Sequence, residues 1–332
     1  MNSKPRSSED EIIANFFAPL AGPAGLGLRD DAALLSVAAE CELVVSTDVL
    51  TSGVHFFADD PPGLIARKAL RANLSDLAAK AAEPAGFLLG LALPGDWTED
   101  WLTAFAQGLG EDVACFDCPL IGGDTVRSLG ALSLSITALG TVPNGKMVTR
   151  AGVEDGDFLY VTGTVGDAAL GLRLRRPPGT DRAWGEALSP PARDYLLMRH
   201  FLPLPRLSLR DALRGFAHAA MDVSDGLVGD LTKMLALTGM SAEIALADVP
   251  LSKAARQALA QEASLIEPIL TGGDDYEIIC AIAPGDAMAF EREAAGLPVT
   301  RIGVAKAGVE KLRVRDTEGR PLAFSLGSYR HF

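Results

Sequence analysis

The chain lacks several features that mark common classes of protein. Its 332 residues contain no uninterrupted apolar run of about 18 residues, as a membrane span requires, and they begin without an apolar signal core. Positive charge is also not in excess, because 43 acidic residues outnumber 30 basic ones and give a net charge of −13. Free nucleic acid and anionic membrane surfaces are therefore unexpected partners, and we expect a cytoplasmic protein.

Cysteine and histidine are scarce, with four of each. Cys115 and Cys118 form a single C-x-x-C pair, but no second pair or nearby histidine completes a zinc site, so reduced structural thiols are expected. The histidines show no zinc spacing, and no G-x-S-x-G nucleophile motif occurs. His200 and His218 are expected to be structural or surface residues. His55 follows an acidic motif and is a candidate for lining a pocket.

The pattern of the sequence favours two layered domains. Hydrophobic residues make up 48% of the chain and charged residues 22%, which is enough apolar surface for sizeable cores. Strand-like runs alternate with helix-like stretches in both halves, which predicts α/β or α+β domains. Residues 140–157 are rich in Gly, Pro, Asn and charge, so we place the boundary there and predict domains 1–145 and 146–332.

Residues 68–84, KALRANLSDLAAKAAEP, predict a helix that opens near Pro62 and stops near Pro84. Its apolar stripe consists of Leu70, Leu74, Leu77 and Ala81. Asp76 lies on an adjacent stripe with Asn73 and Lys80. Asp76 is either a solvated partner of Lys80 or a metal ligand facing a polar cavity, and this stretch alone favours the first alternative.

Three other segments carry specific expectations. Residues 34–37 predict a strand, and residues 176–192, rich in Pro and Gly, predict a surface loop. Residues 140–147, GTVPNGKM, nearly match a phosphate-binding loop, but Met147 replaces the required hydroxyl residue and Pro143 lies inside the loop. We interpret this segment as an ordinary turn, which disfavours a kinase of the phosphate-loop type.

Aspartates recur where predicted strands end, directly after small or hydroxyl residues. VVSTD, LIGGD and AMDVSD end at Asp48, Asp124 and Asp225, and acidic pairs occur at 30–31 and 274–275. Sheet ends are frequent ligand sites, and Mg²⁺ prefers carboxylate oxygens, so convergence of these residues would indicate several ions. Each motif taken singly is also an ordinary turn sequence.

Seven motifs occur in order: GLRDDAALL, VVSTDVLTSGVHF, KALRANLSDLAAKAAEP, LIGGDT, TRAGVEDGDFLYVTGTVGD, MDVSDGL and TGGDDYE. Together they resemble the thiamine-monophosphate kinase family, which belongs to the aminoimidazole ribonucleotide synthetase superfamily, over roughly residues 10–332. The resemblance implies the two-domain α/β fold of that superfamily and a homodimer whose N-terminal sheets pair across a two-fold axis. It also implies ATP-dependent, Mg²⁺-assisted phosphorylation of thiamine monophosphate to thiamine diphosphate.

The resemblance also implies roles for individual residues, with nucleotide, metal and dimer contacts in the first domain and further contacts in the second. The implied Mg²⁺ ligands are Asp31, Ser46, Thr47, Asp48, Asp76, Asp124, Asp222 and Asp225. The implied ATP contacts are Gly123, Asp124, Arg150 and Ser224. The implied substrate contacts are His55, Asp274 and Leu326. No general base is implied, because the acceptor is itself an ionised phosphate.

Three positions depart from the family pattern. Arg29 stands where the family usually has glycine, Asp274 where it has glutamate, and Leu326 where it tends to have an aromatic residue. The last two lie on the thiamine side. A related ATP-dependent enzyme with a different small acceptor, and a non-catalytic nucleotide-binding protein, are therefore alternatives.

Overall fold

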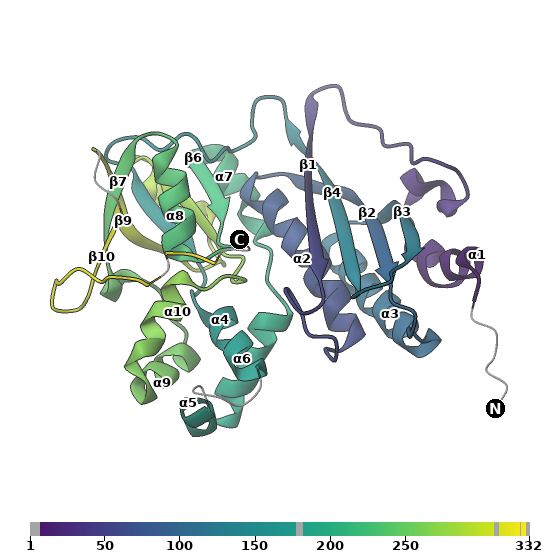
Figure 1. The fold of residues 1–332 in the computed structure, drawn as a ribbon. Helices are drawn as coiled ribbons and strands as arrows, with labels where there is room; N and C mark the ends of the chain where they lie inside the picture. The colour runs from purple at the N-terminus through teal and green to yellow at the C-terminus, as the bar shows by residue number, and fades with distance from the viewer. Residues whose placement is uncertain (1–6, 177–181, 309–311, 326, 330–332) are drawn as a thin grey trace. The chain divides into compact units, whose positions relative to one another are not determined.

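The computed structural model describes residues 7–176, 182–308, 312–325 and 327–329. The chain divides into two compact units. The first unit is Met1–Leu77 with Ala82–Gly145, and the second unit is Ala78–Ala81 with Lys146–Phe332. Each unit contains a β-sheet and several helices (Figure 1). The predicted α/β class is therefore confirmed.

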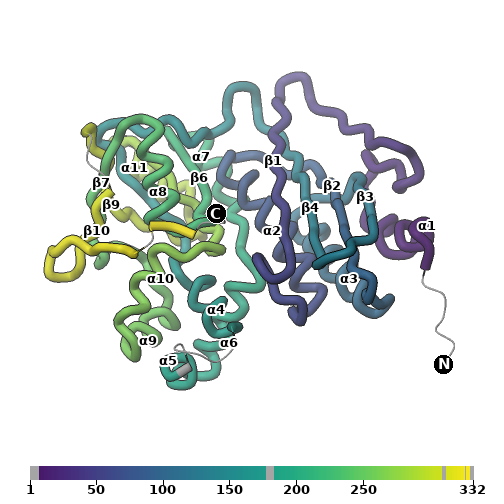
Figure 2. Tube along the Cα trace, in the orientation of Figure 1, coloured from purple at the N-terminus to yellow at the C-terminus, as the bar shows by residue number. Residues whose placement is uncertain are grey.

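The first unit contains a four-stranded sheet within the described residues, in the order β1-β4-β2-β3, with β4 between β1 and β2 in the chain trace of Figure 2. β1 and β2 run antiparallel to β4, and β2 runs parallel to β3. The strands are β1 (Cys41–Thr51), β2 (Glu83–Leu93), β3 (Leu120–Arg127) and β4 (Ser133–Pro143). The helices are α1 (Glu9–Ile12), α2 (Pro62–Ala79) and α3 (Glu99–Phe116).

Helices α2 and α3 cover one face of this sheet. The predicted apolar stripe is confirmed for Leu70, Leu74 and Leu77, which are fully buried on α2 and pack in one core with Leu102 and Phe105 of α3 and with Leu91 of β2. Ala81 is also buried but lies beyond the end of α2. The opposite face of the sheet keeps large apolar side chains exposed, at between 36% and 59% of their surface: Leu43, Val45, Val49, Leu88 and Val126.

The predicted end of the long helix is wrong. α2 begins at Pro62 as expected but ends at Ala79, and Pro84 lies inside β2. The backbone of Ala81 adopts a left-handed φ of 57°, which terminates the helix before the proline can. The predicted strand at 34–37 is also wrong. These residues form no regular element, because they pair with no strand of the two described sheets and the amide of Leu34 donates to the carbonyl of Ala24 instead.

The second unit contains a six-stranded sheet within the described residues, in the order β10-β7-β9-β5-β8-β6. β10 pairs parallel with β7, and the other pairs are antiparallel. The strands are β5 (Phe158–Thr162), β6 (Ala217–Asp222), β7 (Met240–Ala245), β8 (Ile278–Ile282), β9 (Val299–Ala307) and β10 (Arg313–Arg315). The helices are α4 (Asp167–Arg175), α5 (Arg182–Ala187), α6 (Pro190–Phe201), α7 (Arg210–Phe216), α8 (Leu227–Ala236), α9 (Lys253–Gln261), α10 (Ile266–Thr271) and α11 (Ala287–Glu293).

The surface loop predicted at 176–192 is corrected in part. Residues 177–181 lie outside the described residues, but α5 and the start of α6 fall within the predicted loop. The physical reason is that Trp184 and Leu188 are buried in the core of the second unit. Residues 140–147 form the end of β4 and a turn with Gly145 at φ 69°, not a strand-to-helix phosphate loop. No helix in the described ranges is long and apolar enough to cross a membrane.

Candidate active site

Asp48 on β1 lies close to the carboxylate of Asp76 on α2. Ser46, two residues before Asp48 on the strand, donates a hydrogen bond of 2.5 Å from its Oγ to Asp76 Oδ2. Burial, and secondarily the negative charge of Asp76, raise the pKa of Asp48 to about 6. Lys80, the alternative partner of Asp76, donates to the carbonyl of Ala220 at 2.7 Å, both within the second unit. This pair of repelling carboxylates favours binding of a cation.

Asn73 fixes the backbone of this acidic pair, a role that the sequence analysis missed. Its side chain is fully buried; Oδ1 accepts a hydrogen bond from the amide of Asp48 at 3.0 Å, and Nδ2 donates to the carbonyl of Ala69. The signal was present in the sequence, because Asn73 precedes Asp76 by three residues and shares its side of the helix. Through these two bonds, the side-chain amide of Asn73 connects the backbone of β1 to that of α2.

Thr47 differs from its neighbours on β1. Successive side chains of a strand alternate between its two faces, so Thr47 points away from the side that carries Ser46 and Asp48. Its hydroxyl donates to the carbonyl of Ile136 at 3.0 Å and contacts Thr137 Oγ1 on β4. The structure therefore does not bring the Thr47 side chain to Asp76.

His55 lies in the turn after β1, where its amide donates to the carbonyl of Thr51 at 3.0 Å and two further hydrogen bonds hold the residue. Its Nδ1 accepts from the amide of Thr51 at 3.0 Å, and its carbonyl accepts from the buried Lys68 Nζ at 3.0 Å. Because Nδ1 is the acceptor, the neutral imidazole carries its proton on Nε2. The turn thus fixes both the direction and the tautomer of this ring.

A cavity of about 700 Å³ in the first unit brings together three other predicted residues, Asp31, Gly123 and Asp124. Gly123 has a φ of 157°, and a Cβ at this position would lie 2.0 Å from the carbonyl oxygen of Leu89 on the neighbouring strand. No side chain fits there. Gly123 therefore borders the cavity with main-chain atoms alone, beside the carboxylates of Asp31 and Asp124.

In the described part of the chain, no three His, Cys, Asp or Glu side chains form a group that could hold a metal ion unaided. The predicted ligands of the first unit instead fall into two groups, Asp48 with Asp76, and Asp31 with Asp124 in the cavity. Mg²⁺ commonly takes one or two carboxylates and completes its octahedron with water and substrate phosphates. The donor chemistry of these residues therefore fits Mg²⁺ held jointly with a polyphosphate.

In the second unit, Asp222, Ser224 and Asp225 lie where β6 ends and before α8 begins. Asp222 is 3% exposed, whereas Ser224 and Asp225 are half-buried. The carboxylate of Asp225 accepts from Lys233 Nζ at 2.5 Å, and its amide donates to Asp230. Any cation at Asp225 would therefore compete with the ammonium group of Lys233.

Arg150 is exposed and belongs to an irregular segment that runs beside β6. The carbonyl of Thr149 accepts from the amide of Ala220, and a Cβ on Gly152 would lie 2.0 Å from the carbonyl oxygen of His218. His218 itself lies 3.0 Å from both carboxylate oxygens of Asp157, which agrees with its expected structural role. The segment carries Arg150 along the strand that ends at Asp222.

Asp274 follows Gly273 in a turn with left-handed backbone, at a φ of 71°. Its carboxylate Oδ2 lies 3.7 Å from Nδ1 of the buried His200, so this histidine adjoins a predicted substrate residue. Leu326 lies outside the described residues. Three residues later, the amide of Tyr329 donates to the carbonyl of Asp225, and its side chain is 45% exposed. Tyr329 is thus an aromatic side chain of this segment that remains exposed, whereas Phe324 packs against the core of the second unit.

The two units and their acidic residues correspond to a known class of protein. The aspartates predicted at strand ends lie inside the strands in the first unit, Asp48 in β1 and Asp124 in β3, because both strands continue beyond these residues. The AIR synthase related protein N-terminal domain matches residues 29–142, and the AIR synthase related protein C-terminal domain matches residues 154–315. The chain is 43% identical over 303 residues to the thiamine-monophosphate kinase of Caulobacter vibrioides, covering 89% of this chain and 83% of that protein.

Solved structures agree with this class. A crystal structure of thiamine-monophosphate kinase from Stenotrophomonas maltophilia K279a superposes with a TM-score of 0.80 at 39% identity, covering 94% of this chain and 96% of that one. A structure of AaThiL complexed with AMPPCP and TMP superposes at 0.76 with 28% identity, covering 91% of both chains. This chain belongs to the thiamine-monophosphate kinase family.

Proposed function

We propose that this protein transfers the γ-phosphoryl group of ATP to the phosphate of thiamine monophosphate, forming thiamine diphosphate and ADP. The observation that carries the proposal is the match to thiamine-monophosphate kinases, which spans 89% of this chain at 43% identity for one relative. A relative of the same fold binds AMPPCP and TMP together. We also propose that the enzyme acts in the cytoplasm.

The metal ligands are acidic residues of both units, with Ser46 and Thr47 adding neutral oxygens. In the first unit these carboxylates are Asp31, Asp48, Asp76 and Asp124, and in the second they are Asp222 and Asp225. Because the Thr47 side chain is bound to β4, this residue would contribute its main-chain oxygen. When bound, Mg²⁺ ions neutralise the phosphate charges and hold the reacting oxygens in line.

The remaining residues bind and orient the substrates. Gly123 lets a phosphate approach the backbone of β3, while Arg150 and Ser224 contact the nucleotide. His55 directs its Nε2 proton toward the phosphate of the acceptor, because Nδ1 is already bound to Thr51. Asp274 contacts the thiamine phosphate. A general base is not needed, since the attacking phosphate oxygen is ionised at neutral pH.

The chain acts as a homodimer in this proposal. The open face of the first sheet exposes the apolar side chains of Leu43, Val45, Val49, Leu88 and Val126. Contiguous apolar surface of this kind marks interaction sites in soluble proteins. Pairing of two such faces would cover it, as the family resemblance implies.

The test is incubation with ATP, Mg²⁺ and thiamine monophosphate, with thiamine diphosphate and ADP measured by chromatography. Formation of both products in equal amounts is expected. If thiamine diphosphate does not form, the proposal is wrong. A screen of other phosphorylated acceptors by ADP release then tests the alternative suggested by Asp274, a related enzyme with a different acceptor. Tight binding of ATP without turnover of any acceptor would indicate a non-catalytic protein.

A further inference from the structure

The motif TGGDDYE contains three acidic residues with different surroundings. The side chain of Asp274 is 25% exposed, whereas Asp275 and Glu277 are completely buried. The proposed function uses only Asp274. Burying two carboxylates is costly unless each is fully hydrogen-bonded or paired with a cation, so the two buried acids need an explanation of their own.

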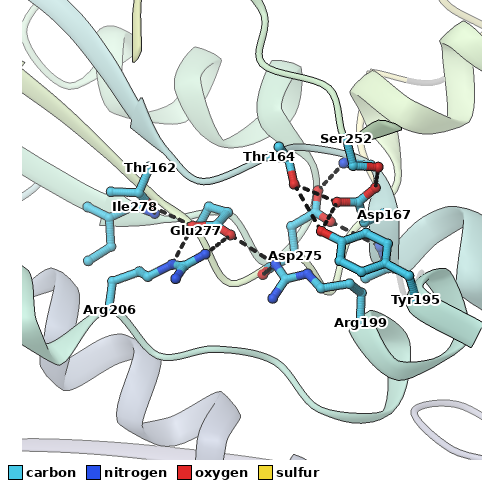
Figure 3. A network of polar contacts seen from close by, with 12 residues as sticks. Thr162, Thr164, Asp167, Tyr195, Arg199, Arg206, Ser252, Asp275, Glu277 and Ile278 are labelled. Carbon is cyan, nitrogen blue, oxygen red and sulfur yellow. Dashed lines mark hydrogen bonds and ion pairs between the residues drawn. The ribbon is translucent and has the colours of Figure 1, made fainter. Parts of the chain in front are cut away.

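Glu277 is held by four donated hydrogen bonds from three residues (Figure 3). Arg206 donates to both carboxylate oxygens, from Nε at 2.6 Å and from Nη2 at 2.5 Å. Arg199 Nη2 donates at 2.9 Å, and Thr162 Oγ1 donates at 2.6 Å. A Cβ added to Gly163 would lie 2.3 Å from Glu277 Oε1, so the backbone encloses the carboxylate on a further side. The bidentate bonding by Arg206 fixes the position of the Glu277 carboxylate and balances its charge.

Asp275 anchors the same turn to a helix. Its two carboxylate oxygens accept from the amides of Gly166 at 2.6 Å and Ala168 at 3.1 Å, where α4 begins. Arg199 Nη2 also donates to the main-chain carbonyl of Asp275 at 3.2 Å. The arginine thus contacts the turn at two points, the carbonyl of Asp275 and the carboxylate of Glu277.

The turn between these anchors has a strained backbone. Asp274 and Tyr276 have left-handed φ angles of 71° and 52°, which are uncommon for residues other than glycine. The amides of Asp274 and Tyr276 donate to the carbonyls of Ser224 and Val223. Such a conformation persists only where the surrounding structure enforces it. The clamp at Glu277 and the cap at Asp275 supply that constraint.

We propose that Glu277, clamped by Arg199 and Arg206, is a positioning residue that holds this turn and thereby aims the carboxylate of Asp274 at the acceptor. The inference rests on the proposed function, because Asp274 is there the contact to thiamine phosphate. The same clamp keeps the turn bonded to the Val223–Ser224 segment. Glu277 and its two arginines touch no substrate themselves.

Arg206→Lys is the variant for the test, because it keeps the charge and loses the bidentate geometry. Glu277→Gln would leave two buried guanidinium groups without a carboxylate and can fail to fold. We expect Arg206→Lys to raise the KM for thiamine monophosphate about tenfold while kcat changes less than about threefold, since small displacements of binding groups carry large penalties. The matched control is Arg315→Lys, at an Arg315–Glu243 ion pair of 2.7 Å on other strands of the same unit, where the KM should not change.

A double-mutant cycle with Asp274→Asn tests whether the clamp acts through Asp274. In the Asp274→Asn background, Arg206→Lys should raise the KM by less than about twofold. The proposal would be overturned if the increases in KM caused by the two substitutions multiply in the double mutant. It would also be overturned if Arg206→Lys lowers the melting temperature and leaves the KM unchanged.

Hydrogen exchange gives a readout that does not depend on turnover. The amides of Asp274 and Tyr276 should exchange faster in Arg206→Lys than in Arg315→Lys, and equal rates would refute the clamp. If the wild-type protein leaves thiamine monophosphate unchanged, the proposed function fails, and the exchange rates still decide whether the clamp holds the turn.

Discussion

Replacing Asp76 by asparagine separates the two roles that this residue could have. The substitution removes one negative charge and one metal-ligating oxygen but keeps the shape of the side chain. The remaining Oδ1 can still accept the hydrogen bond that Ser46 donates at 2.5 Å. Folding should therefore be preserved, and the melting temperature should stay within about 4 °C, which corresponds to about 1 kcal/mol in a unit of this size.

The effect on turnover should be much larger than the effect on stability. Charge stabilisation by a bound metal contributes several kcal/mol to a phosphoryl-transfer transition state, and each 1.4 kcal/mol changes the rate about tenfold. Loss of one carboxylate from the proposed metal site should therefore lower kcat by about 100- to 1000-fold. The structure also predicts a change that needs no substrate. Because the charge of Asp76 raises the pKa of Asp48, that pKa should fall below its value of about 6 in the variant.

The assay combines steady-state kinetics at saturating Mg²⁺, a thermal melt, and a carbon-detected NMR titration of Asp48 without metal. Asp76→Glu serves as a control that keeps the charge. Activity of the asparagine variant within about twofold of wild type would support the surface ion pair with Lys80 that the sequence first favoured. An unchanged pKa of Asp48 would show that the two carboxylates do not interact, and the metal site would lose its main physical support.

Three further substitutions have expected outcomes. Gly123→Ala should lower stability by about 1–3 kcal/mol or more and weaken ATP binding, because the Cβ of the alanine would lie 2.0 Å from the Leu89 oxygen. An unchanged melting temperature and an unchanged KM for ATP would contradict this prediction. Arg71→Met should lower the free energy of unfolding by about 2–3 kcal/mol in a denaturant titration, because Asp112 loses two bonds from Arg71, at 2.6 and 2.8 Å, inside the core and keeps the 3.0 Å bond from Arg67 Nε. Burial raises the pKa of Asp275 well above its ordinary value of about 3.9, so the folded state holds its proton more tightly than the unfolded state. Relative to Asp275→Asn, the wild type should therefore lose stability as the pH rises above about 4, and melts that shift in parallel would count against it.

Local periodicity in the sequence was enough to predict the helix α2 and the direction of its apolar stripe. Periodicity was not enough to show that residues 34–37 form no strand or that Trp184 lies in a helix. A strand needs a pairing partner and a short helix needs a core to pack on, and both come from distant parts of the chain. The end of α2 was misplaced for a different reason. The left-handed Ala81 stops the helix, and no residue preference marks an alanine for that backbone.

The candidate site was likewise predictable from the sequence only in part. Motif order identified Asp48 and Asp76, but only the fold revealed Ser46 as the hydrogen-bond partner of Asp76. Alternation along β1 could have shown in advance that Thr47 points the other way. The burial of Glu277 could not have been foreseen, because its partners Arg199 and Arg206 lie more than seventy residues earlier in the chain.

The left-handed backbone at position 274 also bears on which acidic residue suits this position. Aspartate enters that conformation more readily than glutamate, because its short side chain bonds locally to the backbone. Asp274→Glu would therefore strain the turn while extending the carboxylate by one methylene. The backbone of the turn and the reach of the carboxylate thus set opposite demands on the length of this side chain.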